Sequence, residues 1–212
     1  MRRKTLDLVL TLGGAMLVVV LLAAGAIGLW AVNWTNTNVH NQLAQQDIVF
    51  PAKAAFAHAK VGTEIEPVMI PYLEKYAGQE VLTGPQAEAY ADHFIYYHLQ
   101  EIGGGKSYAQ LSGAAMALPK GSPAYTKAEA VVQTIFQGTT LRGLLLEAYG
   151  FWTFGEVALW GSIIAFILAG IMAVLTVLGL VHTRKVSDDE LFPKADRDGR
   201  VETTKESELA KV

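Results

Sequence analysis

The chain has 212 residues, a mean hydropathy of +0.28 and a formal net charge of −3. This charge provides no basic field of the kind that binds phosphates, so we do not expect a nucleic acid as partner. Cysteine is absent, which excludes disulfides, thiolate-ligated zinc, iron–sulfur clusters and a cysteine nucleophile. The apolar residues are concentrated in two segments, and the remainder of the chain has an ordinary polar composition.

Residues 8–32 form the first apolar segment, and they follow a basic N-terminal stretch, residues 1–7. The segment has no charged side chain and, as a helix, is long enough to cross a hydrocarbon core of about 30 Å. Trp30 near its end is typical of the membrane interface. A cleaved signal peptide is the alternative, although the apolar run exceeds the usual length of roughly 7 to 15 residues. We predict a transmembrane helix that uses Ala24 and Gly28 to pack against a second helix.

Residues 33–155 lie between the two apolar segments, and their pattern is helical. The polar stretch up to Gln46 can extend the first helix. The alanine-rich AKAAFAHAK after Pro51 predicts a short second helix, before Pro67 and Pro71 interrupt the chain. No stretch shows the alternation of apolar and polar residues that indicates a half-buried strand. The sequence therefore predicts an all-α fold.

Three capping boxes mark expected helix starts in the second half of this domain. In each, a Ser or Thr is followed three residues later by Gln or Glu, so that both side chains satisfy backbone donors. The three pairs are Thr83 with Gln86, Ser107 with Gln110 and Thr126 with Glu129. The first opens a helix over residues 85–102 that the glycines at 103–105 end, and the second opens a short helix that stops before Pro119. The third opens a helix that leads toward the second apolar segment.

The helix over residues 85–102 holds the clearest cluster of titratable side chains. His93 and His98 are five positions apart, about 140° around a regular helix, so they cannot bind one metal together. No phosphate-binding loop, nucleophile elbow or metalloprotease motif is present. A metal held by a histidine, with His58 as a third candidate, and by a carboxylate from elsewhere in the fold stays open. The sequence itself predicts no catalytic residue, no metal site and no cofactor.

Aromatic residues cluster just before the second apolar segment, as expected for a belt at the lipid headgroups. Arg142 is the one cation in the apolar helix that leads to them. We expect it to form an ion pair with Glu147 or Glu156, and contact with a lipid headgroup is the alternative. The candidate lipid or ligand contacts are Arg142, Tyr149, Trp152 and Trp160.

Residues 156–182 form the second predicted transmembrane helix, and positions 157–181 carry no charged side chain. Small residues recur every four positions along it, which places them in one stripe where another helix backbone can approach. The members of this stripe are Gly161, Ala165, Ala169 and Ala173. We predict that a second membrane helix packs there.

The basic residues beside the two predicted spans set the expected topology. They lie before the first span and after the second, and none lies at positions 31–52, so both termini are expected in the cytoplasm of a plasma-membrane protein. Residues 1–7 are then cytoplasmic and residues 33–155 form an extracytoplasmic domain. Residues 183–212 are rich in charge and poor in large apolar side chains, which predicts a disordered cytoplasmic tail.

Two stretches carry a resemblance to a known group: GPQAEAYADHFIYYHLQEI at 84–102 and QTIFQGTTLRGLLLEAYGFW at 133–152. Together with the flanking spans they resemble an uncharacterised group of two-span membrane proteins of actinobacteria. The resemblance covers the chain to about residue 182 and excludes the tail. It implies a bacterial plasma membrane and no particular site.

No catalytic signature is present, and the predicted spans lack the ionisable side chains that transport pathways normally need. We therefore expect a non-enzymatic membrane protein that acts as an accessory or scaffold subunit of a larger membrane complex, for example a respiratory one. Its expected partners are membrane lipids and other integral membrane subunits. The alternatives are a membrane-anchored extracytoplasmic sensor or ligand-binding protein and, third, a metal enzyme that uses the histidines.

Overall fold

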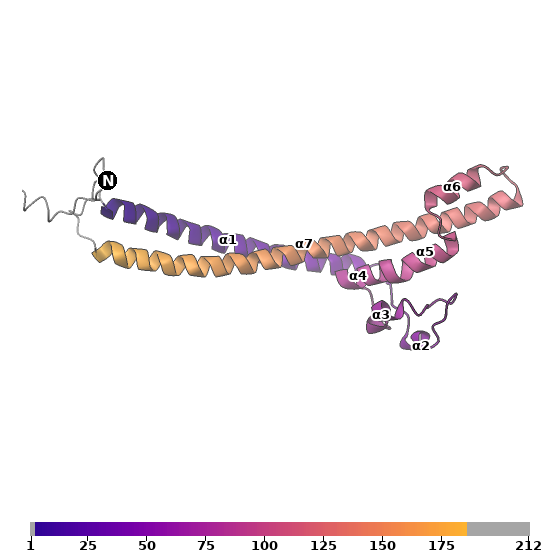
Figure 1. Cartoon of the computed structure of the whole chain (residues 1–212), viewed down its shortest axis with the longest axis horizontal. Coiled ribbons are helices and arrows are strands. Elements are labelled where there is room, and N and C mark those ends of the chain that lie inside the picture. The colour runs from indigo at the N-terminus through magenta and orange to yellow at the C-terminus, as the bar shows by residue number, and fades with distance from the viewer. Residues whose placement is uncertain (1–2, 186–212) are drawn as a thin grey trace, which may run out of the picture. The chain divides into compact units, whose positions relative to one another are not determined.

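The structure is a computed structural model that describes residues 3–185. The regular structure of these residues is helical, as predicted, and the one extended pairing among them is an isolated antiparallel bridge between Val49 and Glu80. The helices are α1 (Arg3–Ala44), α2 (Lys53–Phe56), α3 (Ile70–Leu73), η1 (Glu74–Tyr76), α4 (Gly84–Tyr90), η2 (Ala91–Ile95), α5 (Tyr96–Gly103), α6 (Tyr108–Met116) and α7 (Pro123–Lys185). Figure 1 labels those named α.

The first and last helices, α1 and α7, are each long and apolar enough to cross a membrane. Only 6 % of the most apolar part of each is buried inside the protein. The first helix continues through the polar stretch after the predicted span and ends at Ala44, which confirms the expected extension. The predicted disordered tail lies outside the described residues from 186 onward, and its first three positions, 183–185, belong to α7 instead.

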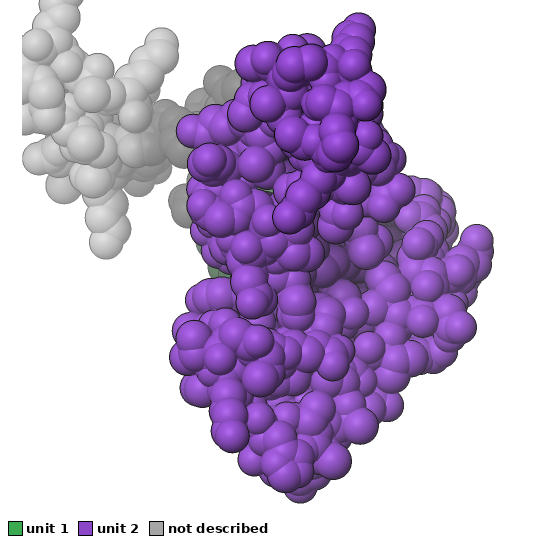
Figure 2. All heavy atoms as spheres, turned by 90° about the vertical axis from the view of Figure 1, so that its right-hand side faces the viewer, with its two compact units in different colours: residues 1–29, 160–212 green, residues 30–159 purple. Residues whose placement is uncertain are grey.

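The chain divides into two compact units. Unit 1 consists of residues 1–29 and 160–212, and unit 2 of residues 30–159, which are purple in Figure 2. Both α1 and α7 therefore contribute residues to both units. The apolar positions of the two helices fall mainly in unit 1, whereas unit 2 contains the short helices.

The core of unit 2 contains residues of α1 and α7 and of the short helices between them. Leu73 and Val81 are fully buried, and the Phe50 ring packs 5.1 Å from the Tyr76 ring and 5.3 Å from the Tyr90 ring, centroid to centroid. Burial of these apolar side chains is the main stabilising term for unit 2. The buried core residues are Val39, Leu43, Phe50, Phe56, Ile65, Met69, Leu73, Val81, Ala87, Ala89, Ala91, Ile95 and Leu145.

The stability of this core depends on pH through the Tyr90 phenol. Burial raises the pKa of its phenol above the usual value near 10, and the Glu64 carboxylate raises it further. The folded state therefore holds the phenolic proton more tightly than the unfolded state does. Its contribution to stability is complete below about pH 10 and is lost as the pH rises through the folded-state pKa.

We therefore expect unit 2 to lose stability above about pH 10, and Tyr90→Phe to reduce that loss. Denaturant midpoints of the full-length protein and of the variant, compared between neutral and alkaline pH, test this expectation. The same alkaline loss in both proteins would contradict it.

The helix predicted over residues 85–102 exists, but it is interrupted by a π-helical turn. Its start is confirmed, because Gln86 Oε1 accepts a hydrogen bond from the Thr83 backbone N–H at 3.0 Å in a capping box. Its end is also confirmed, since Gly104 adopts the left-handed conformation, φ 57°, that glycine tolerates best. The π-helical turn, η2, was not predicted. It widens the helix at the point where Asp92 and His93 lie.

The second capping box is confirmed and the third is wrong. Ser107 opens α6, with its Oγ accepting from the Gln110 backbone N–H at 3.3 Å. Helix α7 begins at Pro123, earlier than predicted, and Ser122 Oγ accepts from the Tyr125 backbone N–H at 3.1 Å. Thr126 already lies in the helix, and its hydroxyl donates to the Ser122 carbonyl. A serine N-cap followed by proline at the first helical position is a stronger start signal than the box inside it.

Candidate functional site

In unit 1, α1 and α7 run antiparallel and approach closely through glycines (Figure 1). A Cβ placed on Gly14 would lie 2.7 Å from Thr176 Oγ1, and one placed on Gly25 would lie 2.7 Å from the Phe166 ring. Any larger residue at these two positions would force a neighbouring side chain to move. Small residues therefore set the separation of the two helices, as is common between helices in membranes.

The buried face of α7 in unit 1 differs from the predicted stripe. Ala169 is buried, with 2 % of its surface exposed, and Ala165 and Ala173 are half-buried. Gly161 is exposed, and a Cβ added to it would meet no atom within 4 Å. The buried and half-buried positions of α7 in unit 1 are 162, 165, 169, 172, 173, 176, 179 and 183, and apart from 173 they recur three and four residues apart.

The buried face of α7 departs from the predicted stripe because of the pitch of the α-helix. Residues spaced by four advance by about 40° per step, so a stripe of four such residues turns by about 120° around the helix. A helix pair in long contact instead buries positions at an average spacing near 3.5. The buried face of α1 also departs from the predicted pair of Ala24 and Gly28. Gly25 is buried and Gly28 is half-buried, whereas Ala24 is exposed. Packing of the second membrane helix on the whole predicted stripe stays a prediction.

A polar group lies at one end of this helix pair. His182 Nε2 is 4.0 Å from Asp7 Oδ2, a distance that makes an ion pair when the imidazole is protonated. Thr11 and Thr183 are buried there, and each hydroxyl donates to a backbone carbonyl four residues earlier in its own helix. These two hydroxyls are thus satisfied within their own helices rather than across the interface.

In unit 2, the π-helical turn η2 and α7 form a charged contact. Arg142 Nη2 donates to Asp92 Oδ1 at 2.6 Å, and the guanidinium carbon lies 5.2 Å from the centroid of the Tyr96 ring. About one third of each charged side chain is exposed. Beside this contact, His93 stacks on Tyr72 with ring centroids 3.5 Å apart and an interplanar angle of 5°. π-helical turns occur frequently at functional sites, which makes this cluster a candidate.

The expected ion pair of Arg142 is therefore wrong in its partner. Glu147 is five positions further along α7, so its side chain points about 140° away from that of Arg142. Glu156 is about 21 Å further along the same helix axis. Asp92 precedes Arg142 by 50 positions and comes close only because α7 packs against the helix that contains η2. Contact of Arg142 with a lipid headgroup stays a prediction.

A double-mutant cycle between Asp92→Asn and Arg142→Gln tests the contact. We expect a coupling free energy of about 0.5–1 kcal/mol, because both side chains are partly solvated. The matched control is the cycle between Glu147→Gln and Arg142→Gln, for which we expect no coupling. Denaturant unfolding of the full-length variants measures both cycles, and additive effects of the first pair would contradict the proposed contact.

The other candidate residues lie apart from this contact. Trp152 is half-buried over Gly84 and stacks on Tyr149 at 5.8 Å, whereas Trp160 belongs to unit 1 and is 63 % exposed. His98 Nδ1 lies 2.7 Å from the Phe94 carbonyl oxygen. Among the described residues, no three His, Asp or Glu side chains are arranged to hold a metal ion.

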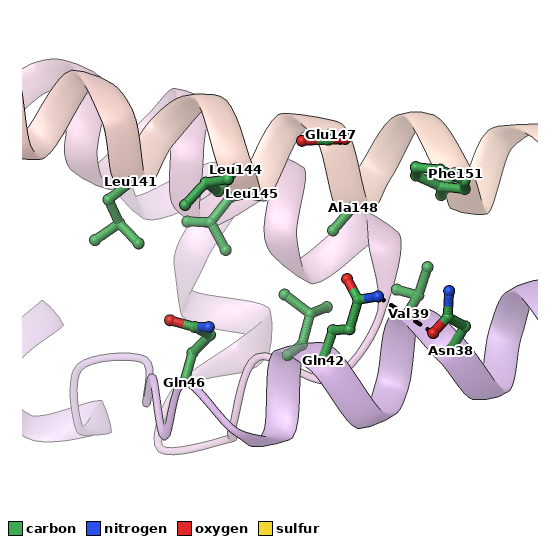
Figure 3. Close-up of a pocket in the computed structure, with 11 residues that line it drawn as sticks. Asn38, Val39, Gln42, Gln46, Leu141, Leu144, Leu145, Glu147, Ala148 and Phe151 are labelled. Atoms are coloured by element: carbon green, nitrogen blue, oxygen red, sulfur yellow. Dashed lines mark hydrogen bonds between the residues drawn. The ribbon is translucent and has the colours of Figure 1, made fainter.

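An open cleft of about 190 Å³ lies in unit 2 between the C-terminal part of α1 and the middle of α7 (Figure 3). Its floor consists of buried apolar side chains, and two large apolar residues on its edge, Leu144 and Phe151, are 56 % and 43 % exposed. Asn38 and Gln42 form an amide pair on the α1 edge, with Gln42 Nε2 donating to Asn38 Oδ1 at 3.2 Å. The sequence carried no single motif for this cleft. The remaining lining residues are Val39, Leu43, Gln46, Leu141, Leu145, Glu147 and Ala148.

No family model matches the chain, and no curated protein or solved structure matches it either. Three features of the described residues therefore bear on function: the apolar helix pair of unit 1, the Asp92–Arg142 contact and the cleft between α1 and α7.

Proposed function

We propose that the chain is an integral membrane protein that acts, without catalysis of its own, as an accessory or scaffold subunit of a larger membrane complex. The observation that carries this proposal is the outward surface of unit 1. Large apolar side chains stay exposed along both helices after α1 and α7 have packed on each other. Examples are Leu10, Met16, Ile27, Ile164, Ile167, Val174 and Leu178.

Such a surface needs an apolar environment. At about 25 cal/mol per Å² of apolar surface, exposure of two whole helix faces to water would cost far more than a domain's net stability. Large exposed apolar patches on soluble proteins mark contacts with membranes or with other proteins. Lipid and the helices of partner subunits together supply that environment. In a water-soluble chain the same surface would be in contact with water.

The orientation of the proposed subunit follows from its charges. The last turn of α7 contains His182, Arg184 and Lys185, and the N-terminus begins with basic residues. Basic residues at the ends of spans favour the cytoplasmic side. We therefore propose that the chain lies in a bacterial plasma membrane with both termini on the cytoplasmic side. Residues 33–155 then lie on the opposite side.

Extraction of a tagged full-length chain in a mild detergent tests the proposal. We expect it to purify with other integral membrane subunits in a fixed stoichiometry, measured by native mass spectrometry, and a harsher detergent should release it. An absorption spectrum of the same fraction would detect haem in the partner subunits. A homogeneous monomer in the mild detergent would overturn the proposal in favour of the ligand-binding alternative.

A further inference from the structure

The cleft between α1 and α7 opens to the surface of unit 2 over an apolar floor. Its floor is formed by Val39, Leu43 and Leu145, which are nearly fully buried, and its edge exposes Leu144 and Phe151 to solvent (Figure 3). Exposed large apolar side chains around a buried apolar floor are expected where a partner side chain inserts and excludes water.

The lining residues repeat at the spacing of packed helices. On α7, Leu141 and Ala148 are seven positions apart, and so are Leu144 and Phe151. From α1, the lining positions 38, 39, 42 and 43 also include pairs three and four residues apart, and Gln46 lines the cleft from the turn that follows α1. Two helices that present such rows side by side form the holes into which the side chains of a third helix fit.

The size of the cleft favours a helix over a free ligand. Its volume of about 190 Å³ is below the range of about 300–1,000 Å³ that is usual for sites of drug-sized molecules. One or two large apolar side chains of a helix would fill it. The rest of the helix would lie across the exposed edge residues.

The charge of the cleft indicates what kind of helix it binds. Glu147 is the only charged residue among those that line the cleft. A second copy of the chain that met this groove with its own groove would bring an identical carboxylate beside Glu147, and like charges at an interface are unfavourable. A lysine or arginine on the incoming helix would instead complement Glu147.

We propose that this cleft binds an amphipathic helix of another membrane subunit, which inserts large apolar side chains and places a lysine or arginine beside Glu147. This inference rests on the proposed function, since it names the surface through which the subunit contacts its partner. The helix-in-groove mode is common in protein recognition and needs no rearrangement of the two groove helices.

Site-specific photo-crosslinking in membranes that contain the full-length chain tests the inference. A benzoylphenylalanine replaces Gln42, which is exposed on the edge of the cleft, and in a control it replaces Gln100, which is exposed on α5. A third probe at Ile167, 58 % exposed in unit 1, reports on membrane partners independently of the cleft. We expect the Gln42 probe to crosslink one membrane protein, in a helical segment with apolar residues three and four apart and a nearby lysine or arginine.

The charge requirement is tested by reversal. Glu147 is exposed, so Glu147→Lys should leave the fold intact and should lower the crosslink yield from position 42 by about tenfold. Substitution of the mapped partner lysine or arginine by glutamate should restore the yield. A yield that does not change with Glu147→Lys would overturn the inference.

The two probes separate this inference from the proposed function. Partner crosslinks from Ile167, together with lipid, a second copy or no product from Gln42, would overturn the helix-binding cleft and leave the accessory subunit standing. Equal yields from Gln42 and Gln100 would also overturn it. No protein crosslink from either Gln42 or Ile167 would overturn both proposals.

Discussion

Replacement of Leu145 by alanine is expected to lower the free energy of unfolding of unit 2 by about 2–5 kcal/mol. The Leu145 side chain is only 1 % exposed and lies in the core that α7 shares with the short helices. Its truncation removes buried apolar surface and leaves a cavity, because close-packed neighbours relax only in part. Guanidinium unfolding of the full-length protein in detergent, followed by circular dichroism, measures the loss.

The neighbouring Leu144→Ala is the matched control. Leu144 is on the same helix but 56 % exposed, so the same truncation is expected to cost less than about 0.5 kcal/mol. Because Leu144 lines the cleft, its substitution should instead weaken the partner crosslink from position 42. Equal destabilisation by the two substitutions would contradict the burial pattern of α7.

Substitution of Gly84 by alanine is expected to have the next largest effect, a loss of about 1–3 kcal/mol. Gly84 is the first residue of α4, and a Cβ on it would collide with Cβ and Cγ of Trp152. These atoms lie next to the α7 backbone and cannot rotate away, so the start of α4 would have to move from α7. A shift of tryptophan fluorescence to longer wavelength and a lower unfolding midpoint would report this displacement.

Gly113→Ala provides the matched control for this substitution. Gly113 lies within α6, and a Cβ added there would meet no atom within 4 Å. Alanine is preferred over glycine inside a helix by roughly 0.5–1 kcal/mol, so this variant should be as stable as the unchanged protein or more so. An unchanged midpoint for Gly84→Ala would show that α4 and α7 do not pack as closely as described.

Local signals in the sequence predicted several of the helix boundaries, but not the short helices α3 and η1. The capping boxes at Thr83 and Ser107 involve residues three positions apart, and the end at Gly104 depends on one residue's conformation. Local interactions of this kind do not depend on the rest of the fold. The box at Thr126 failed because two start signals overlapped, and the proline after Ser122 decided between them.

The candidate site was predicted only in part. Arg142 stood out as a lone cation in an apolar helix, but its partner Asp92 comes from a helix that no spacing rule relates to it. The widened turn at η2 was equally hidden, because its sequence reads as ordinary helix. The cleft needed two helices from opposite ends of the chain, so neither helix alone could reveal it.

The sequence by itself determined an all-α chain with two long apolar helices, because composition, helical periodicity and end caps act over a few neighbouring residues. Only the tertiary structure decided which face of each helix is buried, which carboxylate holds Arg142 and where the cleft lies. These features depend on the register of helices that are distant in the sequence. A shift of one residue turns a helix face by about 100°, so register is set by packing and not by local pattern.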